Sequence, residues 1–249
     1  MQSKPIIQCL QLIPGELPFE FTGDALDLEL HAGERVSIIG PNYSGKGHWL
    51  KTICGLEEQR SGRLEINGID TLDMSADDWV KTRTKVTYIH ADTALLSAAN
   101  GLINTMIPAL YHGMEQDQGR ELLAERALDI LEEIDPHIDL DELPAYLTKE
   151  HRYKIAVARA LLLKPDVLAL NNPFAHFNKD SRSLFETFLS KQAKKGLCLI
   201  MVVHDVDYAI NNSDRIIFTD RENLYQFHSN QAFLNCGIPI VNNFIQSNT

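Results

Sequence analysis

The stretch "GPNYSGKGHWL" (40–50) decides the fold class. It satisfies the pattern G-x-x-x-x-G-K through Gly40, Gly45 and Lys46, and its glycines let backbone N–H groups approach phosphate oxygens closely. It follows the β-rich run "RVSIIG" (35–40) and precedes an expected helix over "GHWLKTICGL" (47–56), whose N-terminus favours negative charge. The spacing predicts a phosphate-binding loop. The alternative is a glycine-rich strand-to-helix turn that holds no ligand.

The loop departs from the usual pattern at one position. Phosphate-binding loops place a Ser or Thr hydroxyl on magnesium directly after the lysine, whereas Gly47 stands there in this chain. Magnesium is a hard cation that prefers oxygen ligands, so the pattern predicts a phosphate cradle without its usual metal ligand. The predicted binding residues are Gly40, Pro41, Asn42, Tyr43, Ser44, Gly45, Lys46, Gly47 and His48.

Short apolar runs predict the strands of an α/β fold. They are "RVSIIG" (35–40), "KVTYIH" (85–90), "DVLAL" (166–170), "LCLIMVVH" (197–204) and "RIIFT" (215–219). Such runs suit strands buried on both faces, and the helical patterns between them favour a mainly parallel sheet. "SGRLEINGID" (61–70) differs, because alternating apolar residues followed by Asn67-Gly68 predict a hairpin and hence an N-terminal antiparallel β patch.

The middle of the chain predicts a helical subdomain. No strand is expected over 91–155, and "RELLAERALDILEEID" (120–135) places Leu123, Ala127, Ile130 and Ile134 on one helix face. The acidic run "EEIDPHIDLDE" (132–142) is expected to be a solvated loop. We expect a single domain over 1–249, with a core of about 1–90 and 156–230, a helical subdomain of about 91–155 and a C-terminal tail over 231–249.

Composition limits the classes of partner. A net charge of −11 argues against nucleic acid, because binding phosphate backbones needs clustered Lys and Arg. No signal peptide and no apolar run of about 18 residues is present, so we expect a cytoplasmic protein that reaches the inner or plasma membrane through a partner. The four dispersed cysteines are expected to be small buried residues without disulfides or metal.

Two further stretches make the chain resemble a known family. "YLTKEHRYKIAVARALLLKPDVLALNNPF" (146–174) is similar to the ABC-transporter ATPase segment in which the LSGGQ signature, a helix and the Walker B strand follow one another. "MVVHDVDYAINNSDRIIF" (201–218) resembles the segment that carries the family's switch histidine. The resemblance implies a P-loop NTPase fold of the ABC type. "NNPF" (171–174) and "NTMIPAL" (104–110) look most like the ATPases of Mla/Mce-type lipid-trafficking systems, which implies lipid transport.

Departures from the family fall on its catalytic positions. Asn171 stands at the Walker B aspartate, Asn172 at the catalytic glutamate, His90 at the Q-loop glutamine and His204 at the switch histidine. With Gly47 and Asn171, the usual groups that place magnesium are gone. Asn172 has no basic oxygen to polarise an attacking water, an effect that typically supplies about 10²–10⁴-fold in rate. These positions are therefore treated as degenerate, and no catalytic residue or metal ligand is assigned.

The signature segment is also altered. It is Leu147, Thr148, Lys149, Glu150 and His151. The resemblance implies that this segment presses on the γ-phosphate bound by an opposite subunit, where two glycines normally allow close backbone approach. Lys149 and Glu150 put side chains there, and Glu150 adds a like charge facing phosphate, although Thr148 keeps a hydroxyl and Lys149 could contact phosphate. A symmetric ATP sandwich of two copies is therefore not expected.

The sequence leaves two functions open. The first is an ATP-binding subunit of an ABC transporter that binds ATP weakly or without magnesium and hydrolyses it poorly or not at all. It would dock a membrane-embedded permease through about residues 88–112 and form a homodimer or heterodimer with another ABC ATPase. The second is a nucleotide-free pseudoenzyme, an interaction or regulatory module in a membrane transport complex. The intact Gly40–Lys46 loop favours the first, and the joint losses at the catalytic positions favour the second.

For the adenine base, the resemblance implies an aromatic platform upstream of the loop. Phe19 and Phe21 in "LPFEFTG" (17–23) are the candidates, and the alternative is that both anchor an N-terminal strand.

Overall fold

A computed structural model of the chain describes residues 4–248 and divides into two units. The two β-sheets belong to the first unit. The first unit comprises the residues up to Tyr88, Asp166–Asn172 and the residues from Gln192 onward. The second comprises Ile89–Pro165 and Pro173–Lys191. It extends beyond the expected helical subdomain of 91–155. Each unit has its own apolar core.

The larger sheet has the strand order β10-β9-β3-β8-β7-β6. Its strands are β3 (Arg35–Ile39), β6 (Val86–Ile89), β7 (Val167–Asn171), β8 (Cys198–Val202), β9 (Arg215–Thr219) and β10 (Leu224–Phe227). The pairs β9-β3, β3-β8 and β8-β7 are parallel, and β10 pairs antiparallel with β9. The five predicted strands and the mainly parallel sheet are thereby confirmed. β8 is buried along its whole length, as expected for a strand covered on both faces.

The smaller sheet is antiparallel and has the order β2-β1-β4-β5. Its strands are β1 (Ile7–Pro14), β2 (Leu26–Leu30), β4 (Gln59–Ile66) and β5 (Ile69–Asp70). The predicted hairpin joins β4 and β5, where Ile66 pairs with Ile69 and both Asn67 and Gly68 have positive φ. Two positive φ values are what a two-residue hairpin turn of this kind requires, and Asn-Gly supplies them with little strain.

Within residues 4–248, five helices of the first unit accompany these sheets. They are α1 (Lys46–Ile53), α2 (Ala76–Lys85), α8 (Val206–Asn212), α9 (Asn230–Leu234) and α10 (Pro239–Asn248). The C-terminal segment packs on its own unit, because Phe244 of α10 meets Phe218 of β9 edge-on at 5.3 Å and Val241 is fully buried. All four cysteines are free, and burial raises the pKa of the Cys54 thiol to about 12.

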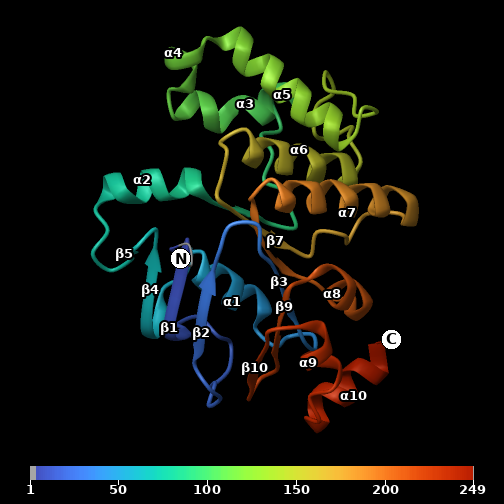
Figure 1. The fold of residues 1–249 in the computed structure, drawn as a ribbon. Coiled ribbons are helices and arrows are strands. Elements are labelled where there is room, and N and C mark those ends of the chain that lie inside the picture. Colours follow the sequence, from blue (N-terminus) through green and yellow to red (C-terminus); the bar gives the residue numbers. More distant parts are fainter. Residues whose placement is uncertain (1–3, 249) are drawn as a thin grey trace. The chain divides into compact units, whose positions relative to one another are not determined.

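The second unit is helical. It contains α3 (Gly101–Tyr111), α4 (Met114–Gln118), α5 (Arg120–Ile134), α6 (Lys149–Leu161) and most of α7 (Lys179–Lys194). Figure 1 shows α3 and α5 side by side, and Met106 and Ala109 of α3 share a core cluster with Leu123 and Ala127 of α5. The predicted helix face is confirmed at three positions, whereas Ile130 is only half-buried and Leu131 is buried beside it.

None of the helices within residues 4–248 is both long and apolar enough to cross a membrane.

Candidate functional site

The carboxyl ends of three neighbouring strands bring the predicted catalytic positions of the first unit together. β3, β8 and β7 are adjacent and parallel, so the residues that follow them lie at one edge of the sheet. β3 leads into the loop at Gly40, β7 ends at Asn171, and His204 follows β8 by two residues. A backbone hydrogen bond of 2.9 Å from Asn172 N–H to the Val202 carbonyl ties two of these strand ends together.

The loop between β3 and α1 takes a conformation that depends on its glycines. Gly40 has φ 147°, and a Cβ there would lie 1.9 Å from the Thr219 carbonyl oxygen. Gly45 has φ 77°, and a Cβ there would meet Leu17 at 2.6 Å. α1 begins directly after it at Lys46, so the first N–H groups of this helix have no intrahelical acceptor. The loop therefore presents backbone donors at a helix N-terminus, the arrangement that binds phosphate.

Lys46 lies across this loop and is almost fully buried. Its Nζ donates to the carbonyl oxygens of Gly40 at 2.8 Å and Pro41 at 2.5 Å. Burial lowers the pKa of Lys46 to about 8, so near neutral pH the ammonium is still mostly protonated. Within the described residues, the buried Ser44 hydroxyl has no hydrogen-bond partner. Tyr43, with φ 61°, is exposed at the tip of the loop.

Asn171 faces Gly47 at the position where the resemblance would place a metal. A Cβ on Gly47 would lie 3.7 Å from Asn171 Nδ2. The same Nδ2 donates to the Tyr88 hydroxyl at 3.1 Å, so the amide presents N–H groups rather than a carboxylate. Burial raises the pKa of Tyr88 although the Asn171 hydrogen bond lowers it, and the hydroxyl stays protonated near neutral pH. The two positions thus supply neither a hydroxyl nor a carboxylate.

Asn172 and His204 complete the strand-end cluster. Asn172 has φ 52°, a left-handed conformation that Asn tolerates better than most residues. The pKa of His204 is lowered, first by partial burial and then by repulsion from the Lys46 ammonium.

Three further residues that the sequence offers as contacts for the nucleotide lie in this unit, namely His48, Phe19 and Phe21. His48 Nδ1 lies 2.8 Å from a Glu57 carboxylate oxygen, so its side chain pairs with that residue. Phe21 is 3% exposed and meets Trp49 edge-on at 5.5 Å, so it cannot offer a face to a base, and that prediction is wrong. Phe19 remains a candidate, half-buried, with the Arg221 guanidinium 5.9 Å from its ring.

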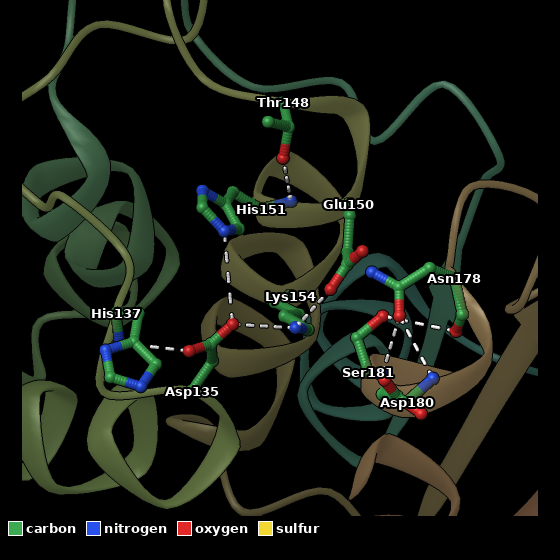
Figure 2. A network of polar contacts seen from close by, with 9 residues as sticks. All are labelled: Asp135, His137, Thr148, Glu150, His151, Lys154, Asn178, Asp180 and Ser181. Atoms are coloured by element: carbon green, nitrogen blue, oxygen red, sulfur yellow. Dashed lines mark hydrogen bonds and ion pairs between the residues drawn. The ribbon is translucent and has the colours of Figure 1, made fainter. Parts of the chain in front are cut away.

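In the second unit, the altered signature forms the start of α6 (Figure 2). Thr148 is the N-cap, and its hydroxyl accepts a hydrogen bond from the His151 N–H at 3.0 Å. Lys149 and Glu150 occupy the first helical turn, and Leu147 is buried. The segment is therefore a regularly capped helix start with a basic and an acidic side chain in its first turn.

Buried Lys154 organises the polar contacts around this helix start (Figure 2). Its Nζ donates to Glu150 at 2.5 Å and to Asp135 at 2.7 Å, and His151 Nε2 lies 4.0 Å from the same Asp135 oxygen. Burial by itself raises the pKa of Asp135, but hydrogen bonds from Lys154 and the His137 N–H outweigh it and hold that pKa below its ordinary value. The solvated-loop prediction is thus wrong for Asp135, whose side chain is 14% exposed.

The sequence predicts that Glu150 adds a negative charge facing phosphate, but in the structure this carboxylate forms an ion pair. Lys154 pairs with it, although two carboxylates share one ammonium and leave one net negative charge. On the neighbouring surface, Lys149, Arg152 and His176 line a hollow of about 110 Å³. His90 is exposed and accepts a hydrogen bond from the Asp92 N–H at 3.2 Å, which holds it against its own loop.

Sequence reasoning missed Tyr88, Asp135 and Lys154. The spacing of Glu150 and Lys154, four residues apart on a helix, was a signal for their ion pair. Tyr88 and Asp135 reach their partners only through the tertiary fold, 83 and 19 residues away along the chain. No local pattern indicates either contact.

Comparison with known proteins gives a consistent result. The sequence profile of the ABC transporter family matches residues 24–175. Among curated relatives, the lipoprotein-releasing system ATP-binding protein LolD 1 of Rhodopirellula baltica is 29% identical over 197 residues, covering 78% of this chain and 84% of its own. The Fe(3+) ions import ATP-binding protein FbpC 1 of Rhizobium meliloti is 32% identical over 202 residues, covering 81% of this chain and 55% of its own.

Solved structures share the fold. A dimeric ATP-binding cassette bound to ADP and Pi has a TM-score of 0.76 and 22% identity, covering 89% of this chain and 98% of its own. The cbiO1 subunit of the Clostridium perfringens cbiONQ transporter complex has a TM-score of 0.79 and 20% identity, covering 98% of this chain and 100% of its own. The predicted α/β fold of the ABC ATPase type is thereby confirmed.

Proposed function

The chain belongs to the ABC transporter ATP-binding family, and from this premise we propose that it binds ATP without a protein-held magnesium ion and hydrolyses it poorly or not at all. The proposal rests mainly on one observation: Gly47, which has no side chain, lies beside the Asn171 amide at the loop. The loop keeps the backbone and the lysine that bind phosphate. The two positions at which the family resemblance implies metal-placing groups carry Gly47 and Asn171 instead.

Magnesium does not fit the residues present. The ion takes octahedral oxygen coordination and is usually held by one or two carboxylates beside substrate phosphates. Here Gly47 has no side chain, and the Asn171 Nδ2 that faces it is a hydrogen-bond donor already directed at Tyr88. A donor suits phosphate oxygens and repels a cation. No step of the proposed function therefore passes through magnesium.

Phosphate binding has its own support. The loop backbone from Asn42 to Gly45 and the start of α1 supply N–H donors, and Lys46 supplies a buried ammonium. The unpartnered Ser44 hydroxyl is a further donor. In this proposal the Lys46 ammonium leaves the carbonyl oxygens of Gly40 and Pro41 when a phosphate oxygen replaces them as its acceptor.

The setting is a membrane transport complex. Relatives in this family are named as ATP-binding proteins of transport systems, so the proposed partners are a membrane-embedded permease and a second ATPase subunit, at the cytoplasmic side of the membrane. The relatives' names cover lipoprotein release and iron import, so they do not select a cargo. Lipid remains the proposed cargo on the Mla/Mce resemblance alone, although Asn104 and Met106 of that motif are buried within the helical unit.

A nucleotide-free interaction module is the second candidate. The observation in its favour is that both carbonyl contacts of Lys46 come from the loop itself, so the ammonium has acceptors without phosphate. In that case the loop would be a folded turn that stabilises the β3–α1 connection, and the protein would act through its surfaces.

Calorimetric titration of the full chain with ATP, once with magnesium and once with EDTA, separates the two candidates. We expect binding of similar affinity in both conditions, and its loss in Lys46→Ala. Lys81→Ala is the matched control, because it removes an exposed lysine of α2 in the same unit. No heat at about millimolar ATP in either condition would support the interaction module, and binding only with magnesium would contradict the proposed site.

A further inference from the structure

A second cluster of charged and metal-ligating side chains includes His48 together with two glutamates. Glu16, His48 and Glu57 each direct one ligand atom into a space where all three atoms lie within 4.8 Å of one another. The residues come from three places in the chain, the turn after β1, the first turns of α1 and the turn after α1. We propose that this cluster binds one divalent transition-metal ion of the zinc class.

The geometry of the cluster is built by the fold. The Gly15 N–H donates to the Glu58 carbonyl at 2.9 Å, and a Cβ on Gly15 would lie at the same distance from that oxygen. This close backbone approach fixes the turn that carries Glu16 against the turn that carries Glu57. The helix between them presents His48, so each ligand is attached to ordered backbone.

Glu57 is the anchor. Its side chain is only 8% exposed, and its two oxygens have different partners, with Lys51 Nζ 2.7 Å from Oε1 and His48 Nδ1 2.8 Å from Oε2. Lys51 therefore orients the carboxylate and leaves Oε2 for the imidazole or for a metal between them. Such outer partners typically decide ligand orientation in metal sites.

The ligand types select the ion. One imidazole nitrogen and two carboxylate oxygens, with water in the remaining position, are a tetrahedral set that Zn²⁺ accepts at about 2.0–2.2 Å. Mg²⁺ prefers six oxygens, and Ca²⁺ prefers six to eight, so a histidine at the centre favours neither. With neutral imidazole, the two carboxylates and Lys51 carry one net negative charge, which favours a dication.

Metal titration of the full chain tests this inference. Metal-stripped protein is titrated with Zn²⁺ by calorimetry, and Co²⁺ is used as a spectroscopic probe, because a tetrahedral Co²⁺ site gives visible absorption bands. We expect one Zn²⁺ per chain, and an affinity weakened at least about tenfold in His48→Gln and in Glu16→Gln. Excess Mg²⁺ should not displace the ion.

The controls separate this site from chance surface binding. Glu16 is exposed, so its substitution leaves the core intact, and His31→Gln removes a histidine of a simple pair with Glu29 at 3.5 Å. His31→Gln should bind Zn²⁺ as the wild type does. Absence of binding at about 0.1 mM Zn²⁺, or an affinity as high as that of the wild type in both His48→Gln and Glu16→Gln, would make the cluster an ordinary ion pair. Lys46→Ala should keep the Zn²⁺ affinity, so this test is independent of ATP binding.

Discussion

At the scale of single residues, the proposed magnesium-independent binding of ATP depends on Gly47 and Asn171. Their separation, with a Gly47 Cβ at ordinary contact distance of 3.7 Å from the amide, leaves room for a hydroxyl-bearing side chain. The backbone of Gly47 lies within α1, where serine is compatible. Under the proposed function, a metal site would therefore require two changed side chains and no change in the loop's shape.

The variant Gly47→Ser with Asn171→Asp should restore magnesium dependence to ATP binding. It adds a hydroxyl and a carboxylate where the structure holds a bare backbone and an amide. In calorimetric titrations, the double variant should bind ATP about tenfold more tightly with magnesium than with EDTA, whereas the wild type should show no such difference. Equal affinities in the double variant would show that other residues exclude the metal.

Asn172 has a left-handed backbone conformation that asparagine adopts more readily than most residues. With φ 52°, a residue with a Cβ and no local hydrogen-bonding group is strained there. Asn172→Ala should lower the free energy of unfolding by about 1 kcal/mol, while Asn172→Gly should leave it nearly unchanged or raised. Urea unfolding of the three proteins measures this difference. If alanine and glycine behave alike, the left-handed conformation is not what limits this position.

At the scale of elements, the junction of α5 and α6 depends on one buried ammonium. Asp135 caps the C-terminal end of α5, and Glu150 lies in the first turn of α6, so Lys154 holds the two helix ends together. A carboxylate at the start of a helix also interacts favourably with its dipole. The altered signature thus contributes to the stability of the helical unit.

The pH dependence of stability should report on this junction. The pKa of Asp135 is held below its ordinary value of 3.8, so its stabilisation is present above 3.8 and is lost as pH falls through the folded value. The difference in free energy of unfolding between wild type and Asp135→Asn should therefore be largest near neutral pH and shrink below about pH 4. Asp129→Asn, at an exposed position of α5, should show no such trend. A constant difference for Asp135→Asn would mean that the carboxylate contributes through packing alone.

Elements were easier to predict than their contacts. The strands at 35–40 and 197–204 and the Asn67-Gly68 turn follow from apolar runs and turn chemistry, which are local properties. Phe21 is buried, and Asp135 is paired with Lys154, through contacts with segments far along the chain. Composition and spacing therefore do not predict either result. The acidic run around 135 illustrates this, because its charge pattern alone indicates a solvated loop.

At the scale of the whole molecule, the two candidate sites of the first unit differ in how far the sequence alone predicts them. The strand-end cluster of the first unit was predictable, since Gly40, Asn171 and His204 each lie at or just after the end of a recognisable strand. The cluster proposed to bind a metal at Glu16, His48 and Glu57 was not, because only the turn packing brings these residues together. Motifs with fixed spacing are thus visible in a sequence, and sites assembled across turns are not.

Two copies of this chain should not form an ATP-dependent dimer, and we expect a different ATPase subunit as its partner. In a sandwich of the kind the family resemblance implies, the start of α6 would meet the partner's phosphate, and there Lys149 and Glu150 place side chains where the resemblance implies two glycines. Sedimentation velocity with saturating ATP in EDTA should show a monomer.

Glu150→Gln tests whether charge is the obstacle to that dimer. It removes the second carboxylate at nearly constant volume and leaves Lys154 paired with Asp135. If repulsion dominates, this variant should dimerise more readily with ATP than the wild type, and Glu132→Gln, at an exposed position of α5, should not. If Glu150→Gln stays monomeric as well, the bulk of the side chains that replace the two glycines is the obstacle. A wild-type dimer with ATP would contradict the expectation outright, because the altered signature would then accept phosphate as it stands.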